Sequence, residues 1–285
     1  MFREEIRTFD CTIRDGGLIN NHFFEHDFVR SVYHALTAAG VDYMEVGYRN
    51  SKSLFSPAEY GKWKFSDDDD ISRVKEGIES GVKISVMCDI GRVDIKDIKP
   101  RSQSPIDMIR TASYVKDVDK AIHMVNHFTE LGYETTVNIM AVSKALDNEL
   151  DEALHQLEEE TRATVIYIVD SFGALYQESI EYLISKAKRI IKTKEVGFHG
   201  HNNQQLAFSN TIEAIIHGAN YLDGTVYGIG RAAGNCPLEL LLGFLKNPKF
   251  DIRPVLELIS REFIPLRRRI EWGYIIPYAI TGILN

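Results

Sequence analysis

Residues 195–226 read EVGFHGHNNQQLAFSNTIEAIIHGANYLDGTV. The first part, Glu195–His201, and the last, Tyr221–Val226, are short apolar runs typical of strands buried on both faces. The segment between them carries a helical repeat that Gly218 ends, formed by Leu206, Asn210, Ala214 and Ile215. This order of strand, helix and strand predicts a parallel βαβ unit.

The same alternation continues through the rest of the chain. Eight segments are predicted as strands: Arg7–Thr12, Tyr43–Gly47, Lys83–Cys88, Met108–Ala112, Thr135–Ala141, Val165–Asp170, Glu195–His201 and Tyr221–Val226. Helical patterns fill the gaps, for example Phe28, Val32, Ala35, Leu36 and Ala39 before Gly40. Eight such units favour an α/β fold of the (β/α)8 TIM-barrel type, with an open doubly wound sheet as the alternative.

No linker rich in Pro, Gly or Ser divides the chain, so we expect a single domain over residues 1–285. The barrel would span about residues 5–250 and a short C-terminal helical extension about 251–285. The segment Trp272–Tyr278 is too apolar for a free terminus. We expect it to pack on the barrel or on another subunit.

The composition is that of an ordinary globular protein: 285 residues, 44% hydrophobic and 26% charged, with a formal charge of −8. The acidic balance argues against nucleic-acid binding, and no apolar run reaches the ~20 residues that span a membrane. The three cysteines, Cys11, Cys88 and Cys236, form no CxxC motif. They predict a reducing compartment without structural disulfides, and together with the absence of a signal sequence they favour the cytoplasm.

Two segments far apart in the chain supply a set of metal ligands. His199 and His201 are two residues apart on a predicted strand, so both imidazoles face the same side. Arg14 and Asp15 end the first predicted strand, where Gly16-Gly17 allows a turn. Two histidines and one carboxylate leave metal positions open for substrate, and an adjacent arginine can stabilise an anion. Satisfied strand-end histidines and a surface Arg–Asp pair are the alternative interpretation.

Other polar residues stand at strand ends or inside strands. Asp170 ends the sixth predicted strand and is either a substrate-binding residue or a helix cap. Glu45 lies within the second predicted strand, where a carboxylate needs a partner. We expect it to support Arg14 at the substrate site, and Asp10 and Thr12 are further candidates for buried support of Arg14.

The glycine-rich segment GIGRAAGNCP follows the last predicted strand. It is in the wrong context for a dinucleotide loop, so we expect a loop that closes on substrate, with Gly230 and Asn235 as substrate-binding residues and Asn235 near the metal. The run Asp67–Asp70 is predicted to open a helix, where acidic residues suit the N-terminal dipole.

The segments DCTIRDGG, HGHNN and GIGRAAGNCPLE resemble the DRE-TIM metallolyase superfamily, which is HMG-CoA lyase-like. Residues 202–241 and the tail WGYIIPYAITGIL look most like its 4-hydroxy-2-oxovalerate aldolase branch. The resemblance implies a TIM barrel, a divalent metal on Asp15, His199 and His201, and an enolate stabilised by Arg14. It implies Mn²⁺ as the cofactor, with Mg²⁺, Zn²⁺ or Co²⁺ as alternatives.

The chain departs from this branch at Leu18, where the aldolase has a catalytic histidine. Either His22, Tyr274 or Tyr278 replaces it, or the chain runs a different reaction. We expect an aldolase (a lyase) that cleaves a 4-hydroxy-2-oxo acid to pyruvate and an aldehyde. The alternatives are an acetyl-CoA-dependent acyltransferase and a metal-binding relative without activity. A homodimer is expected, and the C-terminal region looks too short to dock the branch's aldehyde dehydrogenase partner.

Overall fold

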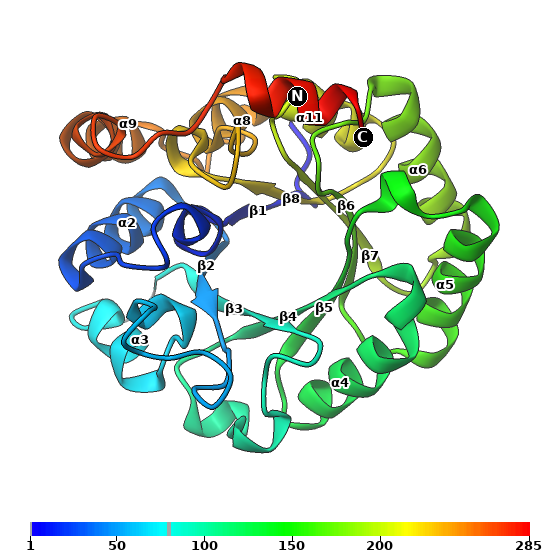
Figure 1. Cartoon of the computed structure of the whole chain (residues 1–285), viewed down its shortest axis with the longest axis horizontal. Helices are drawn as coiled ribbons and strands as arrows, with labels where there is room; N and C mark the ends of the chain where they lie inside the picture. The colour runs from blue at the N-terminus through cyan, green and yellow to red at the C-terminus, as the bar shows by residue number, and fades with distance from the viewer. Residues whose placement is uncertain (1, 79–80) are drawn as a thin grey trace.

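The computed structural model describes residues 2–78 and 81–285, and its central feature is a closed barrel of eight parallel strands in chain order (Figure 1). The strands are β1 (Arg7–Asp10), β2 (Tyr43–Tyr48), β3 (Lys83–Asp89), β4 (Met108–Ser113), β5 (Glu134–Ile139), β6 (Val165–Asp170), β7 (Glu195–Gly200) and β8 (Tyr221–Gly224). The predicted TIM barrel is confirmed, and the open sheet is excluded because β1 pairs with β8.

Helices surround the ring of strands in Figure 1. They are α1 (Thr12–Gly16), α2 (His26–Ala39), α3 (Asp68–Lys75), α4 (Val118–Glu130), α5 (Asp147–Glu160), α6 (Gln177–Ile190), α7 (Ala207–Ile216) and α8 (Leu238–Leu245). The expected acidic start of α3 is confirmed, since Asp67 precedes it and Asp68, Asp69 and Asp70 form its first turn.

The connection between β3 and β4 departs from the predicted alternation. It contains two short 3-10 turns, Ile95–Asp97 and Arg101–Gln103, and no α-helix. Pro100 and Pro105 interrupt this segment, and proline removes a helical hydrogen bond and clashes with the preceding turn. The loop after β3 therefore stays on the rim of the barrel.

The C-terminal extension consists of α9 (Arg253–Leu258), a π-helical turn (Ile259–Phe263), α10 (Ile264–Arg267) and α11 (Ile276–Ile283). The first part packs on α2, where Val255, Leu258 and Phe263 join the apolar layer between helices and strands. Trp272 is buried and its indole N–H donates to the Tyr227 carbonyl at 3.1 Å. The predicted packing of this segment on the barrel is confirmed at Trp272.

Helix α11 lies across the loops that follow β6 and β7. Asn203 donates to the Tyr278 carbonyl at 3.1 Å, and Gln204 hydrogen-bonds both Ala174 and Gly282. Across residues 2–78 and 81–285, none of the helices combines the length and apolar character that a membrane crossing requires.

Candidate active site

Three potential metal ligands meet at the C-terminal mouth of the barrel. Asp15, His199 and His201 are buried, and one ligand atom from each lies within 4.8 Å of the other two. Residues about 185 positions apart in the chain come together here because β1 and β7 both flank β8 in the closed sheet. The sequence predicted this grouping, and the fold produces it.

Helix α1 positions the first ligand. The strand ends at Asp10, and the chain turns into a helix at Thr12 instead of continuing as a strand. The predicted glycine turn is wrong, since Gly16 and Gly17 have φ near −61°. Glycine is needed at residue 17 for space, because a Cβ atom there would collide with the His22 ring. The single helical turn places Arg14 and Asp15 side by side at the mouth.

The histidine rings leave room for an ion. His199 Nδ1 lies 2.8 Å from Asp223 Oδ2, which directs Nε2 toward the cluster. His201 Nδ1 is buried without a hydrogen-bond partner among the described residues, and it lies 3.9 Å from Asp15 Oδ2. This distance is too long for a hydrogen bond. A divalent cation between the two atoms would satisfy both, so the residues present fit a metal.

Electrostatics favour the ligand forms of these groups. Burial lowers the pKa of His201 to about 3, so the ring is neutral and keeps a free lone pair. Burial alone would raise the pKa of Asp15, but its surroundings, which include the Arg14 guanidinium and the hydrogen bond from Asn235, hold that pKa below its usual range. An ionised carboxylate and neutral imidazoles are the states that bind divalent metals.

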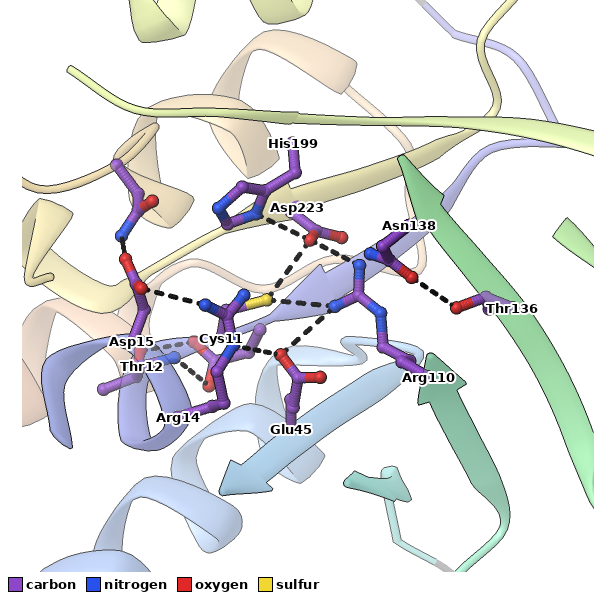
Figure 2. Close-up of polar contacts among 12 residues, drawn as sticks. Cys11, Thr12, Arg14, Asp15, Glu45, Arg110, Thr136, Asn138, His199 and Asp223 are labelled. Atoms are coloured by element: carbon purple, nitrogen blue, oxygen red, sulfur yellow. Dashed lines mark hydrogen bonds and ion pairs between the residues drawn. The ribbon is translucent and has the colours of Figure 1, made fainter. Parts of the chain in front are cut away.

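Buried charges of alternating sign extend from the cluster through the barrel interior (Figure 2). Arg14 contacts Asp15 at 2.8 Å and Glu45 at 2.7 Å. Arg110 contacts Glu45 at 3.3 Å and Asp223 at 2.7 Å. Since Asp223 also holds His199, a chain of ion pairs joins the arginine beside the metal cluster to one of the metal ligands. We call Glu45, Arg110 and Asp223 the interior charge triad.

Arg110 is the centre of this triad. Its guanidinium is fully buried between two rings, 4.3 Å from the centroid of Phe9 and 4.4 Å from that of Tyr167. Sequence reasoning missed Arg110 and Asp223. The signal that identified Glu45, a charge inside an apolar strand, also marks Arg110 in MIRTAS and Asp223 in YLDG.

None of the four expected substrate-binding residues, Glu45, Asp170, Gly230 and Asn235, lines the cavity at the mouth. Glu45 is fully buried beneath Arg14 and acts on it from below, as the support role anticipated. Asp170 accepts hydrogen bonds from the backbone N–H groups of Ala174 and Leu175, so it holds the loop after β6; it does not cap α6, whose N-cap residue is Tyr176. The Thr12 hydroxyl donates to Asp10 and accepts from the Val226 N–H, and no hydrogen bond from Asp10 or Thr12 to Arg14 is observed within the described ranges.

The glycine-rich loop lies against the metal cluster, which is where Asn235 was expected. The Asn235 side-chain amide donates to the Asp15 carboxylate and to the Ile229 carbonyl. Gly230 lies so close that a Cβ atom would meet both the Asn235 amide and the Asp15 carboxylate. The loop thus fixes the carboxylate from the side opposite Arg14.

We expect a Gly230→Ala substitution to lower metal affinity about 10–100-fold, the usual effect of disturbing groups that orient a ligand. The added methyl group displaces Asp15 or Asn235. Isothermal titration of the metal-free protein with Mn²⁺ measures the effect. Gly243→Ala in α8 is the matched control, because a Cβ atom there meets nothing within 4 Å. Equal affinity in both variants would contradict the role of the loop.

The three residues considered for proton transfer lie away from the cluster. His22 is buried behind Gly17, with its ring edge on Tyr48 at 5.4 Å, and burial lowers its pKa to about 3. Tyr274 is 62% exposed, and Tyr278 contributes its backbone carbonyl to Asn203. None of the three lines the cavity at the mouth, whereas Leu18 does.

That cavity has a volume of about 720 Å³ and includes the metal cluster in its wall. Its other lining groups come from every strand end: apolar side chains such as Leu18, Met87 and Phe172, and polar ones at the rim, chiefly Asp89, Arg92, Tyr114, Asp117, Lys120 and Arg231. Asp89 ends β3, and burial raises the pKa of its carboxyl above the usual value.

Asp10 gives the protein a specific pH dependence of stability. Burial raises the pKa of Asp10 from 3.8 to about 7, so the unfolded chain loses this proton before the folded one does. The contribution of protonated Asp10 to the free energy of unfolding is fully present below pH 4 and is lost as the pH rises to 7. Between pH 5 and pH 8, the free energy of unfolding of the wild type should therefore fall by about 2–3 kcal/mol relative to that of Asp10→Asn. Urea denaturation at both pH values tests this, and a constant difference would contradict it.

Comparison with known proteins places this geometry in context. The HMGL-like family profile matches residues 5–259. The 4-hydroxy-2-oxovalerate aldolase of Thermus thermophilus is 31% identical over 252 residues, covering 87% of this chain and 72% of that protein. The Geobacillus thermodenitrificans protein of the same name is 32% identical over 236 residues, covering 83% and 68%.

Two solved structures are similar to this chain in fold. The N-terminal domain of a proposed aldolase from Bacteroides vulgatus superposes with a TM-score of 0.84 at 30% identity, covering 98% of this chain and 93% of that one. Hydroxymethylglutaryl-CoA lyase from Pseudomonas aeruginosa superposes with a TM-score of 0.75 at 17% identity, covering 99% and 98%, and shows the shared fold.

Proposed function

The chain belongs to the HMGL-like family, and from this premise we propose that it is a divalent-metal-dependent aldolase. It cleaves a 4-hydroxy-2-oxo acid to pyruvate and an aldehyde. The observation that carries the proposal is the joint placement of Arg14 and the Asp15–His199–His201 cluster in the wall of one cavity. The aldolases of Thermus and Geobacillus support the reaction class.

Asp15, His199 and His201 would hold the metal, for which we propose Mn²⁺. When bound, the ion polarises the 2-oxo group and neutralises negative charge that develops on its oxygen. Asn235 keeps the Asp15 carboxylate in place. Asp223 fixes the tautomer of His199 by accepting a hydrogen bond from its Nδ1–H group. The two imidazoles suit transition metals, and the carboxylate also suits Mn²⁺.

Arg14 stabilises the enolate. Its Nε donates a hydrogen bond to Glu45 and its Nη1 donates one to Asp15. Its Nη2 makes no hydrogen bond to the residues that the structure describes. The guanidinium is therefore oriented in advance, with one nitrogen left for the substrate. A preorganised cation in a buried site stabilises developing charge without reorganisation during the reaction.

The cleavage itself requires one proton acceptor. The C4 hydroxyl loses its proton, the C3–C4 bond breaks with formation of the aldehyde carbonyl, and the electron pair moves into the pyruvate enolate, which is then protonated at C3. We assign the acceptor role to Asp89, because it lines the cavity and its raised pKa makes it a stronger base than an ordinary carboxylate. Tyr48 also lines the cavity, but burial raises its pKa and keeps it protonated.

Pyruvate release from 4-hydroxy-2-oxovalerate tests the proposal. We expect release that EDTA abolishes and Mn²⁺ restores, and that Asp15→Asn lacks. Thiol release from acetyl-CoA with 2-oxo acids would instead indicate the acyltransferase. Metal binding without any turnover would indicate a relative that has lost catalysis.

Asp89→Asn separates proton transfer from enolate formation. We expect it to lower kcat for aldol cleavage about 10²–10⁴-fold. It should retain decarboxylation of oxaloacetate, which forms the same enolate without loss of a hydroxyl proton. If both reactions fall together, Asp89 is not the proton acceptor.

A further inference from the structure

The cavity is larger than the simplest substrate requires. Even if each of the nine non-hydrogen atoms of 4-hydroxy-2-oxovalerate is given the ~30 Å³ of one liquid water molecule, the substrate fills about 270 Å³. The cavity measures about 720 Å³. More than half of it would remain filled by water with this substrate.

The unused space lies across the barrel from the metal cluster. In a closed ring of eight strands, β3 is opposite β7 and β4 is opposite β8. The loop after β3 carries Arg92, and the segment after β4 carries Tyr114, Asp117 and Lys120, all of which line the cavity. We call these four residues the far wall. A 2-oxo acid bound at the metal must therefore point its C4 end toward the far wall.

The far wall offers both hydrogen-bond donors and acceptors, and each of its two cations is paired with a carboxylate. Arg92 pairs with Asp89 at 3.1 Å, and Lys120 pairs with Asp117 at 2.7 Å. The two cationic side chains are 55% and 66% exposed. Ion pairs this exposed contribute only about 0.2–1 kcal/mol, so incoming groups can replace them at little cost.

Hydroxyl groups suit this arrangement better than the alternatives. A hydroxyl both donates and accepts, so one can donate to Asp117 while another accepts from Lys120 or Arg92. A phosphate or carboxylate would meet the carboxylates of Asp89 and Asp117 as well as the two cations. A long apolar tail would cover these charges without satisfying them.

We propose that the substrate beyond C4 is a neutral polyhydroxylated chain, so that the aldehyde released is sugar-like. The proposal rests on the aldolase function and specifies its substrate class. Leu18, Met87 and Phe172 belong to the apolar part of the cavity wall, and the far wall binds the hydroxyls.

The reverse condensation of pyruvate with a panel of aldehydes tests this directly. The panel is acetaldehyde, butanal, erythrose and glyceraldehyde 3-phosphate, each assayed with the Mn²⁺-loaded protein. We expect kcat/KM for erythrose to exceed that for butanal, its apolar counterpart of equal carbon number, at least tenfold. A preference for butanal, acetaldehyde or the phosphate overturns the proposal. Failure of all four aldehydes, together with no cleavage of 4-hydroxy-2-oxovalerate, would overturn the aldolase function instead.

Variants of the far wall test whether its residues cause the preference for erythrose. Lys120→Gln and Arg92→Gln should each lower the ratio of kcat/KM for erythrose to that for acetaldehyde about fivefold or more. Lys116→Gln is the matched control, because Lys116 lies in the same segment, is exposed and does not line the cavity. An unchanged ratio in both far-wall variants would overturn the assignment.

Discussion

Replacing Arg14 by lysine should lower kcat for aldol cleavage about 10²–10³-fold, the range found when one preorganised donor to an oxyanion is lost. Arg14 holds Glu45 through Nε and Asp15 through Nη1 while it lines the cavity. A lysine ammonium is a single point charge on a flexible stem and cannot serve these directions together. Because lysine keeps the positive charge of Arg14, the loss of kcat measures the contribution of the guanidinium geometry.

Steady-state kinetics with two substrates measure this effect. Decarboxylation of oxaloacetate should fall in parallel with aldol cleavage, because both pass through the enolate that Arg14 stabilises. This parallel loss distinguishes Arg14→Lys from Asp89→Asn. Arg162→Lys, in a surface pair with Glu130, is the control and should retain full activity. A near-normal kcat in Arg14→Lys would contradict the role of Arg14.

The second large effect concerns stability. Arg110→Met should destabilise the fold by about 3–5 kcal/mol, because it leaves the buried carboxylates of Glu45 and Asp223 without their shared cation. It should also weaken metal binding about 10–100-fold, since Asp223 orients His199. Urea denaturation and Mn²⁺ titration measure the two effects separately.

A triple variant removes the electrostatic penalty. Glu45→Gln and Asp223→Asn, combined with Arg110→Met, replace the interior charge triad by neutral groups of similar shape. Stability should recover by several kcal/mol, since uncharged substitutes for buried ion networks are often neutral or better. Metal affinity and kcat should stay low. Full recovery of activity would show that the triad serves stability alone.

The strands were predictable because each is a short apolar run bounded by turn residues. β6 matches its predicted range at both ends, and the other strands differ by a few residues at most. The metal cluster was predictable for the same reason, since strand alternation places His199 and His201 on one side. Helix α1 was not, because a single helical turn leaves no periodic pattern to detect.

The roles of buried charges were harder to predict. Glu45 and Asp170 both occur at the edge of the site, yet one supports Arg14 and the other holds backbone N–H groups. Sequence spacing cannot distinguish these roles, because they depend on which neighbouring strand supplies a partner. Arg110 pairs with residues 65 and 113 positions away in the chain, so its partners become visible only once the barrel closes.

The interior charge triad also constrains how the chain can vary over evolution. Because Arg110 is shared by two carboxylates from different strands, a neutral residue at any one of the three positions removes at least one buried ion pair, and loss of Arg110 leaves Asp223 without a cationic arginine partner. Selection should therefore remove replacements at one triad position alone, whereas simultaneous replacements at all three positions can persist. In related sequences, residues at the positions of Glu45, Arg110 and Asp223 should therefore be inherited as a unit.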